Sequence, residues 1–235
     1  MSYEYLDKNI SEVRRDIEAA RAAVGRTDDV LLLAAVKSAA VHEINYIHRK
    51  LGINDIGENR VQQLLARYDE LDKEGLNIHF IGSLQSNKVK YIIDKVSMIH
   101  SVDSLSLASE IEKQAAKHNL TMKVLVEINI GSEAGKSGIA MEDTEEFLEK
   151  IGEFPHLQPC GLMIIPPKTE FPEENLHFFE KIYQKFIDIR VKKEDNKNWA
   201  VLSAGMSGDY LQAVSRGANL VRVGSAVFGA RSYPV

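Results

Sequence analysis

The feature that most limits how this chain can fold is an eightfold alternation of short apolar runs with amphipathic stretches. The runs are nearly continuous in apolar, mostly aliphatic residues, which is typical of parallel strands covered on both faces. Helical periodicity separates successive runs, as with Ile44, Ile47 and Leu51 after the first. The predicted strands are Val30–Val36, Ile53–Ile56, Ile78–Ile81, Met98–His100, Lys123–Ile130, Gln158–Ile164, Ala200–Leu202 and Leu220–Val223.

This alternation predicts an α/β fold, a single (β/α)8 TIM barrel spanning residues 1–235. Short connections and right-handed crossovers favour a closed parallel barrel. The competing fold is a doubly wound open sheet, which usually has fewer strands. On length alone, two small domains are also possible. An extra helix is predicted over Leu6–Ala23, before the first strand, where it could cap the bottom of the barrel.

Composition argues against several classes of protein. The net charge of −5 disfavours a general nucleic-acid or anionic-membrane partner, because such proteins need a basic face. Residues 1–14 have no signal-peptide core, and no segment approaches the roughly 20 apolar residues of a membrane span. Cys160 is the one cysteine, so it forms no internal disulfide and is interpreted as a packing residue. We therefore expect a cytoplasmic protein without a metal site.

In a TIM barrel, functional groups lie on the loops that follow the strands. Lys37 directly follows the first apolar run. Position alone favours a lysine that reaches solvent, whereas the functional interpretation is a nucleophilic amine desolvated by the barrel mouth. Asn59 follows the second strand and is predicted either to cap the next helix or to hold a ligand oxygen. The polar cluster at 79–88 could line a pocket and bind an anion, although His79 itself is more typical of a hydrogen-bonded core histidine.

Two turns rich in small residues follow the seventh and eighth strands, at 202–209 and 221–229. Small residues let backbone N–H groups approach an oxyanion, and these two loops are the usual phosphate site of TIM barrels. Arg222 lies within the eighth strand. An inward-facing arginine is costly unless it pairs with a ligand or a carboxylate.

Taken in chain order, these motifs resemble the YggS/PROSC family of pyridoxal phosphate homeostasis proteins. The resemblance covers nearly the whole chain, and the ordered set is specific although no single motif is. The matching segments are 35–37, 57–62, 79–82 with 84–85 and 87–88, 101–103, 126–130 with 136–138, 161–163, 205–207 with Asp209, and 221–229. Small departures occur after the lysine, at Ser38-Ala39, and at Ser203-Ala204 and Asn219.

The resemblance implies a barrel similar to the N-terminal domain of alanine racemase that binds pyridoxal 5′-phosphate (PLP). Lys37 would hold the cofactor as a Schiff base, Arg222 would face the pyridine nitrogen, and Asn59 would lie near the ring. The residues expected at the phosphate are Ser207, Gly224 and Ser225, with a backbone contact from Met206.

The function that follows is a monomeric PLP carrier that supports vitamin B6 homeostasis and supplies apo forms of PLP-dependent enzymes. An arginine at the pyridine nitrogen makes the ring a poor electron sink, so no catalytic residue is assigned. The racemase also takes a tyrosine from a second domain, for which this chain is expected to have no room. The alternatives are a weak amino-acid racemase, a non-catalytic docking partner of PLP enzymes, and a conventional barrel enzyme that binds another phosphorylated ligand.

Overall fold

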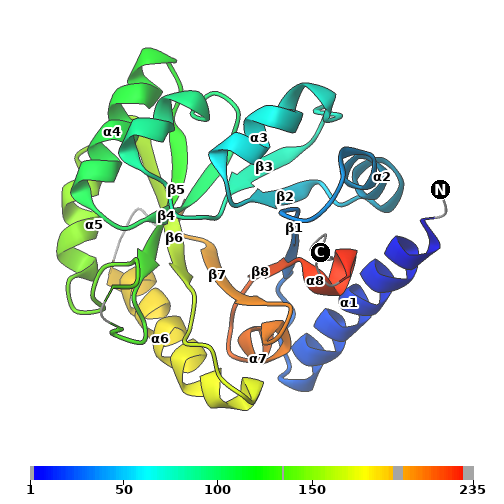
Figure 1. Ribbon diagram of the computed structural model, residues 1–235. Helices are drawn as coiled ribbons and strands as arrows, with labels where there is room; N and C mark the ends of the chain where they lie inside the picture. Colours follow the sequence, from blue (N-terminus) through cyan, green and yellow to red (C-terminus); the bar gives the residue numbers. More distant parts are fainter. Residues whose placement is uncertain (1–2, 134, 193–197, 230–235) are drawn as a thin grey trace.

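A computed structural model describes residues 3–133, 135–192 and 198–229 and confirms the predicted barrel. Eight parallel strands pair in chain order, and β8 closes against β1 (Figure 1). The strands are β1 (Leu31–Ala35), β2 (Asp55–Glu58), β3 (Asn77–Phe80), β4 (Met98–Val102), β5 (Met122–Ile128), β6 (Leu157–Ile164), β7 (Val201–Met206) and β8 (Leu220–Val223).

Helices surround the barrel, and Figure 1 shows α2 to α7 placed around it in chain order. The α-helices are α1 (Glu4–Ala23), α2 (Val41–Leu51), α3 (Val61–Arg67), α4 (Leu105–Lys117), α5 (Thr144–Gly152), α6 (Leu176–Lys192), α7 (Tyr210–Ser215) and α8 (Ser225–Phe228). Short 3₁₀ helices are η1 (Tyr68–Glu70), η2 (Ser86–Tyr91) and η3 (Pro172–Asn175). Within the described ranges, no helix has the length and apolarity needed to cross a membrane.

The apolar core has two parts, because each strand faces both the helices and the barrel interior. The larger part joins the helices to the outside of the strands and includes Ile44, Ile47 and Leu64. Two small clusters lie inside the barrel. One contains Leu33, Ala35, Ile81 and Leu220, and the other Met98, Leu125, Cys160 and Met163. Cys160 is therefore a buried packing residue, as predicted.

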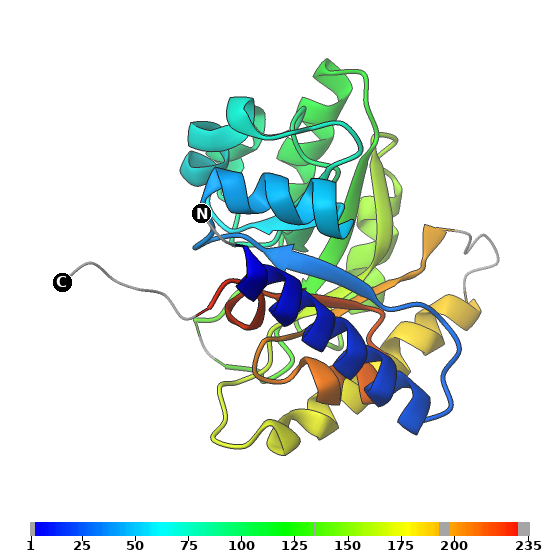
Figure 2. The same ribbon diagram turned by 90° about the vertical axis from the view of Figure 1, so that its right-hand side faces the viewer.

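The N-terminal helix differs from its predicted position. The sequence suggested a cap on the bottom of the barrel, whereas α1 contacts α7, α8 and α2. Figure 1 and Figure 2 show it on the outside of the barrel, beside α7 and α8. The physical reason is its apolar stripe of Leu6, Ile10, Val13 and Ile17, which is buried against the wall. Since α8 has only four residues, α1 occupies the place in the outer ring that a longer final helix would fill.

β7 is longer than predicted and continues to Met206. The small residues from Ser203 onward had suggested a turn, but they extend along β8, with Ser203 opposite Leu220 and Met206 opposite Arg222. Small side chains fit the crowded barrel interior, so they are compatible with a strand there. This extension places Ser203 inside the barrel and brings Met206 to its mouth.

Candidate functional site

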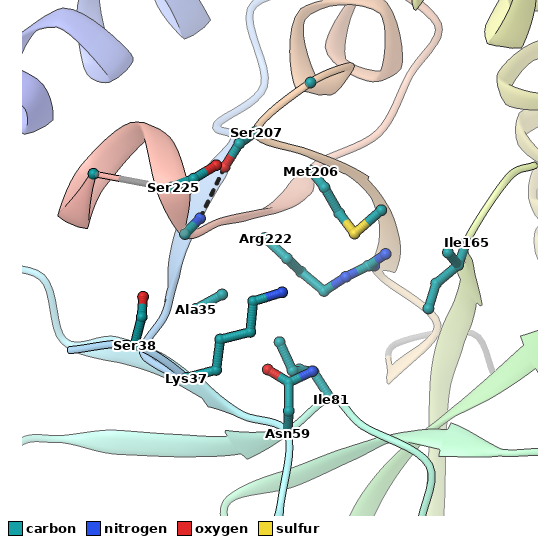
Figure 3. Close-up of a pocket in the computed structure, with 13 residues that line it drawn as sticks. Ala35, Lys37, Ser38, Asn59, Ile81, Ile165, Met206, Ser207, Arg222 and Ser225 are labelled. Carbon is teal, nitrogen blue, oxygen red and sulfur yellow. Dashed lines mark hydrogen bonds between the residues drawn. The ribbon is translucent and has the colours of Figure 1, made fainter. Parts of the chain in front are cut away.

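A cavity of about 550 Å³ opens at the carboxyl ends of the strands. The seven residues that the resemblance assigned to PLP all line it, so the fold gathers them in one place (Figure 3). They come from both ends of the chain because β1 and β8 are paired. The lining residues are Ala35, Lys37, Ser38, Asn59, Ile81, Ile165, Met206, Ser207, Gly208, Arg222, Gly224, Ser225 and Gly229.

Lys37 stands in the turn after β1, and its amine points into the cavity (Figure 3). The residue is exposed, which agrees with the solvent-reaching lysine that its position alone favours and not with an amine desolvated by the barrel mouth. Arg67 holds the backbone on both sides of Lys37, because its Nη1 donates to the carbonyls of Val36 and Ala39, each at 3.1 Å. Arg67 is in turn paired with the buried carboxylate of Glu58, at 2.5 Å. Both partners follow from the fold: Glu58 ends β2 and Arg67 ends α3.

Ser207 connects the two small-residue turns. Its hydroxyl oxygen accepts the backbone N–H of Gly224 at 3.1 Å and that of Ala226 at 3.3 Å. A hydroxyl has two acceptor lone pairs and one O–H donor. Because both lone pairs are used, the Ser207 O–H remains to donate to a ligand in the cavity. Ser225 lies beside it in the same view (Figure 3).

The backbone of Met206 is already engaged. Its N–H donates to Asp209 Oδ1 at 2.7 Å, and its carbonyl accepts the N–H of Asp209 at 3.0 Å. Asp209 is buried and also accepts a hydrogen bond from Asn175 Nδ2 at 3.2 Å. The Met206 backbone is thus bonded to Asp209, and Met206 lines the cavity, while its backbone contact with a phosphate stays a prediction. Asp209 belongs to one of the sequence motifs, but no sequence signal indicated its role in shaping the turn.

Asn59 presents a polar atom that lacks a partner. No side-chain hydrogen bond caps α3, so the predicted capping role is wrong. Its Oδ1 is buried and has no hydrogen-bond partner in the part of the chain that the structure describes. Leaving such an atom unsatisfied costs about 1–3 kcal/mol, which a ligand donor would recover. The second interpretation, an amide that holds a ligand, therefore fits better.

Arg222 is the charged residue deepest in the cavity, with 3% of its surface exposed. Its Nη1 donates to Ser203 Oγ at 2.6 Å and its Nη2 to the carbonyl of Ile164 at 2.8 Å. Burial lowers the pKa of Arg222 to about 10, while the charges of Glu127 and Asp209 oppose that shift. The guanidinium is therefore still cationic at neutral pH.

Glu127 was not identified from the sequence as a functional candidate. It lies near the end of β5 and is 7% exposed. Burial, together with the negative charge of Asp103, raises the pKa of Glu127 to about 7, and Arg222 acts in the opposite direction. A glutamate within a strand carries no sequence signal that distinguishes it from an exposed one.

The polar cluster after β3 contributes little to the cavity. Of the residues at 79–88, only Ile81 lines it, so the cluster as a whole is not part of this cavity. His79 is 5% exposed and bonded to Asp55 and His100 inside the barrel. The interpretation of His79 as a hydrogen-bonded core histidine is confirmed.

Comparison with known proteins gives one family along almost the entire chain. The family model described as "Alanine racemase, N-terminal domain" matches residues 9–232. A protein of Aquifex aeolicus named "Pyridoxal phosphate homeostasis protein" is 38% identical over 226 residues, which cover 96% of this chain and 98% of the relative. A protein of the same name from Escherichia coli K12 is 34% identical and covers 96% of both chains.

Solved structures agree with this assignment. The crystal structure of an unknown protein from Bifidobacterium adolescentis superimposes with a TM-score of 0.89 at 31% identity, covering 96% of this chain and 95% of that one. The structure of PipY from Synechococcus elongatus with PLP bound gives a TM-score of 0.78 at 29% identity, covering 91% of this chain and 100% of that one.

Proposed function

Because this chain belongs to the family described as "Alanine racemase, N-terminal domain" and has relatives named pyridoxal phosphate homeostasis proteins, we propose that it binds PLP at the barrel mouth and takes part in PLP homeostasis. The observation that carries the proposal is the meeting of Lys37, Arg222 and the Ser207 turn in one cavity. The chain would hold the cofactor reversibly and supply it to the apo forms of PLP-dependent enzymes, as a monomer.

The residues present fit this cofactor. PLP carries an aldehyde that condenses with a primary amine, a phosphate, and an aromatic ring with a pyridine nitrogen. Lys37 supplies the amine at the cavity rim, and the Ser207 O–H supplies a donor at the turn suited to the phosphate, where we also place Gly224 and Ser225. The unsatisfied Oδ1 of Asn59 would accept from a donor on the ligand.

Arg222 would lie at the ring nitrogen. A guanidinium is a donor only and stays cationic, so it would favour an unprotonated pyridine nitrogen. An unprotonated ring withdraws electrons less strongly. This arrangement supports holding the cofactor rather than using it for carbanion chemistry.

The other lining residues also support a carrier. Racemisation needs acid–base groups on both faces of a substrate carbon. Among the described residues that line the cavity, Lys37 is the single ordinary acid–base side chain, and none is Asp, Glu, His, Tyr or Cys. The weak racemase therefore remains the second candidate, and it would need a group from outside this lining.

Borohydride trapping tests the site. Wild type, Lys37→Ala and Lys50→Ala are incubated with PLP, reduced and digested. Lys50 is the matched control, because it is an exposed lysine on α2 away from the cavity. We expect a phosphopyridoxyl group on the Lys37 peptide in wild type and Lys50→Ala, and a colourless Lys37→Ala protein. Labelling spread over surface lysines would contradict the proposal.

A second assay separates carrier from catalyst. Loaded protein is mixed with an apo PLP-dependent enzyme, and recovery of that enzyme's activity is followed. Transfer without exchange of the α-hydrogen of added amino acids in D₂O supports the carrier. Measurable exchange that is lost in Lys37→Ala would favour the racemase.

A further inference from the structure

A series of hydrogen bonds crosses the inside of the barrel. Arg222 Nη1 lies 2.6 Å from Ser203 Oγ, and Ser203 Oγ lies 3.2 Å from His100 Nδ1. His100 Nε2 lies 2.9 Å from His79 Nδ1. His79 Nε2 lies 3.0 Å from Asp55 Oδ1, which ends the series. We call Ser203, His100, His79 and Asp55 the interior chain.

The interior chain joins the two ends of the barrel. Arg222 lines the cavity at the carboxyl ends of the strands, whereas Asp55 is the first residue of β2 and lines a separate cavity of about 510 Å³ near the amino ends of β1 and β2. Between them, Ser203 and His100 are fully buried. The Asp55 side chain is 17% exposed, so this end of the interior chain is in contact with water.

With His79 neutral, the acceptor at the far end sets the direction of every hydrogen bond. A carboxylate only accepts, so His79 donates from Nε2 to Asp55 and, when neutral, accepts at Nδ1. His100 then donates from Nε2 to His79. Burial, together with the positive charge of Arg222, lowers the pKa of His100 well below its usual range, so it is neutral and accepts at Nδ1. Ser203 must donate its O–H to that nitrogen and accept from Arg222.

The series therefore runs in one sense, with each group donating toward Asp55. Arg222 has five N–H donors; it donates one to Ser203 Oγ and another to the carbonyl of Ile164. Together these two acceptors fix the plane of the guanidinium. The remaining donors are left for the cavity that Arg222 lines.

We propose that the interior chain consists of positioning residues for Arg222, which fix the guanidinium that meets the ring nitrogen of the bound cofactor. The inference rests on the proposed function for the identity of that ligand. It extends the site from the barrel mouth to Asp55 at the opposite end.

The composition of the barrel interior supports a positioning role. TIM-barrel interiors are usually filled by bulky branched apolar residues. Burying polar groups is tolerated only when each group has a hydrogen-bond partner. Removing one member of the interior chain would therefore leave its neighbours unsatisfied. Filling this volume with Val, Ile or Leu would give an adequate core, but it would leave Arg222 without the acceptor that Ser203 provides.

Nitrogen NMR of the cofactor-free protein tests the direction of the hydrogen bonds along the interior chain. We expect His79 and His100 both as neutral Nε2–H tautomers, and a slowly rotating Arg222 guanidinium whose signals are identified by their loss in Arg222→Lys. Ser203→Ala should release the guanidinium rotation, and Ser203→Thr, which keeps the hydroxyl, should restore it. A protonated Nδ1 on either neutral histidine would overturn the assignment.

Cofactor affinity tests the consequence. Loss of one buried hydrogen bond predicts about tenfold weaker PLP binding in Ser203→Ala, with most of the affinity recovered in Ser203→Thr. Asp55→Asn lies at the far end of the barrel and should weaken binding in the same direction by less. Asn77→Ala is its matched control, because Asn77 Nδ2 also donates a hydrogen bond to Asp55 Oδ1 but Asn77 is not part of the interior chain. Wild-type affinity in both Ser203→Ala and Asp55→Asn would overturn the proposal.

The two proposals fail separately. If wild type does not bind PLP, the proposed function is wrong, and the NMR signals of Arg222 still decide whether the interior chain holds it. If PLP binds but the guanidinium rotates freely in wild type, the interior chain is not a positioning device and the cofactor site stands.

Discussion

The hydroxyl oxygen of Ser207 accepts the backbone N–H of Gly224 at 3.1 Å, so a single side chain joins the turn after β7 to the turn after β8. Ser207→Ala removes this link together with the O–H donor. We expect PLP affinity to fall by about tenfold or more, since hydrogen bonds to charged groups contribute about 1.5–3 kcal/mol. Equilibrium titration of the visible absorbance measures it. Ser38→Ala, on the same rim, is the control, and an equal loss there would remove the special role of Ser207.

Removing Arg67 should destabilise the fold, because Glu58 is fully buried and Arg67 is its cation. Breaking a buried ion pair from one side costs about 3–5 kcal/mol. Arg67→Met should therefore lower the free energy of unfolding in urea by that order. The double variant Arg67→Met with Glu58→Gln should recover part of the loss. An unchanged denaturation midpoint in the single variant would show that the pair contributes nothing.

The same variant should also affect the cofactor site. Arg67 holds the carbonyls of Val36 and Ala39 on either side of Lys37. Without that clamp, the turn gains freedom and borohydride trapping on Lys37 should slow under conditions where the protein stays folded. Trapping at the wild-type rate would indicate that β1 alone positions the lysine.

Glu127 predicts a pH dependence of stability. Its pKa rises from the usual 4.5 to about 7 in the folded protein, so the folded state holds this proton more tightly than the unfolded state. The contribution is fully present below about pH 4.5 and is lost as pH rises through about 7, on the order of 3 kcal/mol in total. In Glu127→Gln this part of the decline should vanish. Parallel pH profiles of unfolding for the two proteins would contradict the assignment.

Gly82→Ala should disturb the cavity through the backbone. A Cβ at Gly82 would lie 2.1 Å from the carbonyl oxygen of Asn59, which lines the cavity and cannot move as a flexible side chain can. We expect lower stability and weaker PLP binding together. Gly152→Ala is the control, since a Cβ there meets open space. Its thermal midpoint should match wild type, and equal effects from both variants would contradict a local displacement of Asn59.

Much of the fold could be predicted because each strand carries its own apolar signal. The strand order of the barrel follows from that repeat and from the handedness of crossovers. The ends of β7 and the place of α1 could not be predicted, because Ser203 to Met206 have weak strand preference and the docking of α1 depends on the shortness of α8. Both depend on tertiary contacts, namely the pairing of β7 with β8 and the part of the barrel wall that the short α8 leaves uncovered.

The binding residues at the loops were predictable, whereas their supports were not. Lys37, Ser207 and Arg222 stand at positions that the barrel itself marks as functional. Arg67, Ser203 and His100 act through residues far away in the sequence, and no local pattern pairs them. The exposed Lys37 agrees with what its position alone favours, whereas the desolvated amine of the functional interpretation depends on how the neighbouring loops fold, which periodicity does not report.

The pairing of β1 with β8 has a consequence for how the protein is made. Lys37 is translated before Ser225, which follows the eighth strand, so the amine and the second turn coexist in one site only when nearly the entire barrel has left the ribosome. An incomplete chain would offer a lysine without its phosphate cradle. Capture of the reactive aldehyde would then be coupled to completion of the barrel.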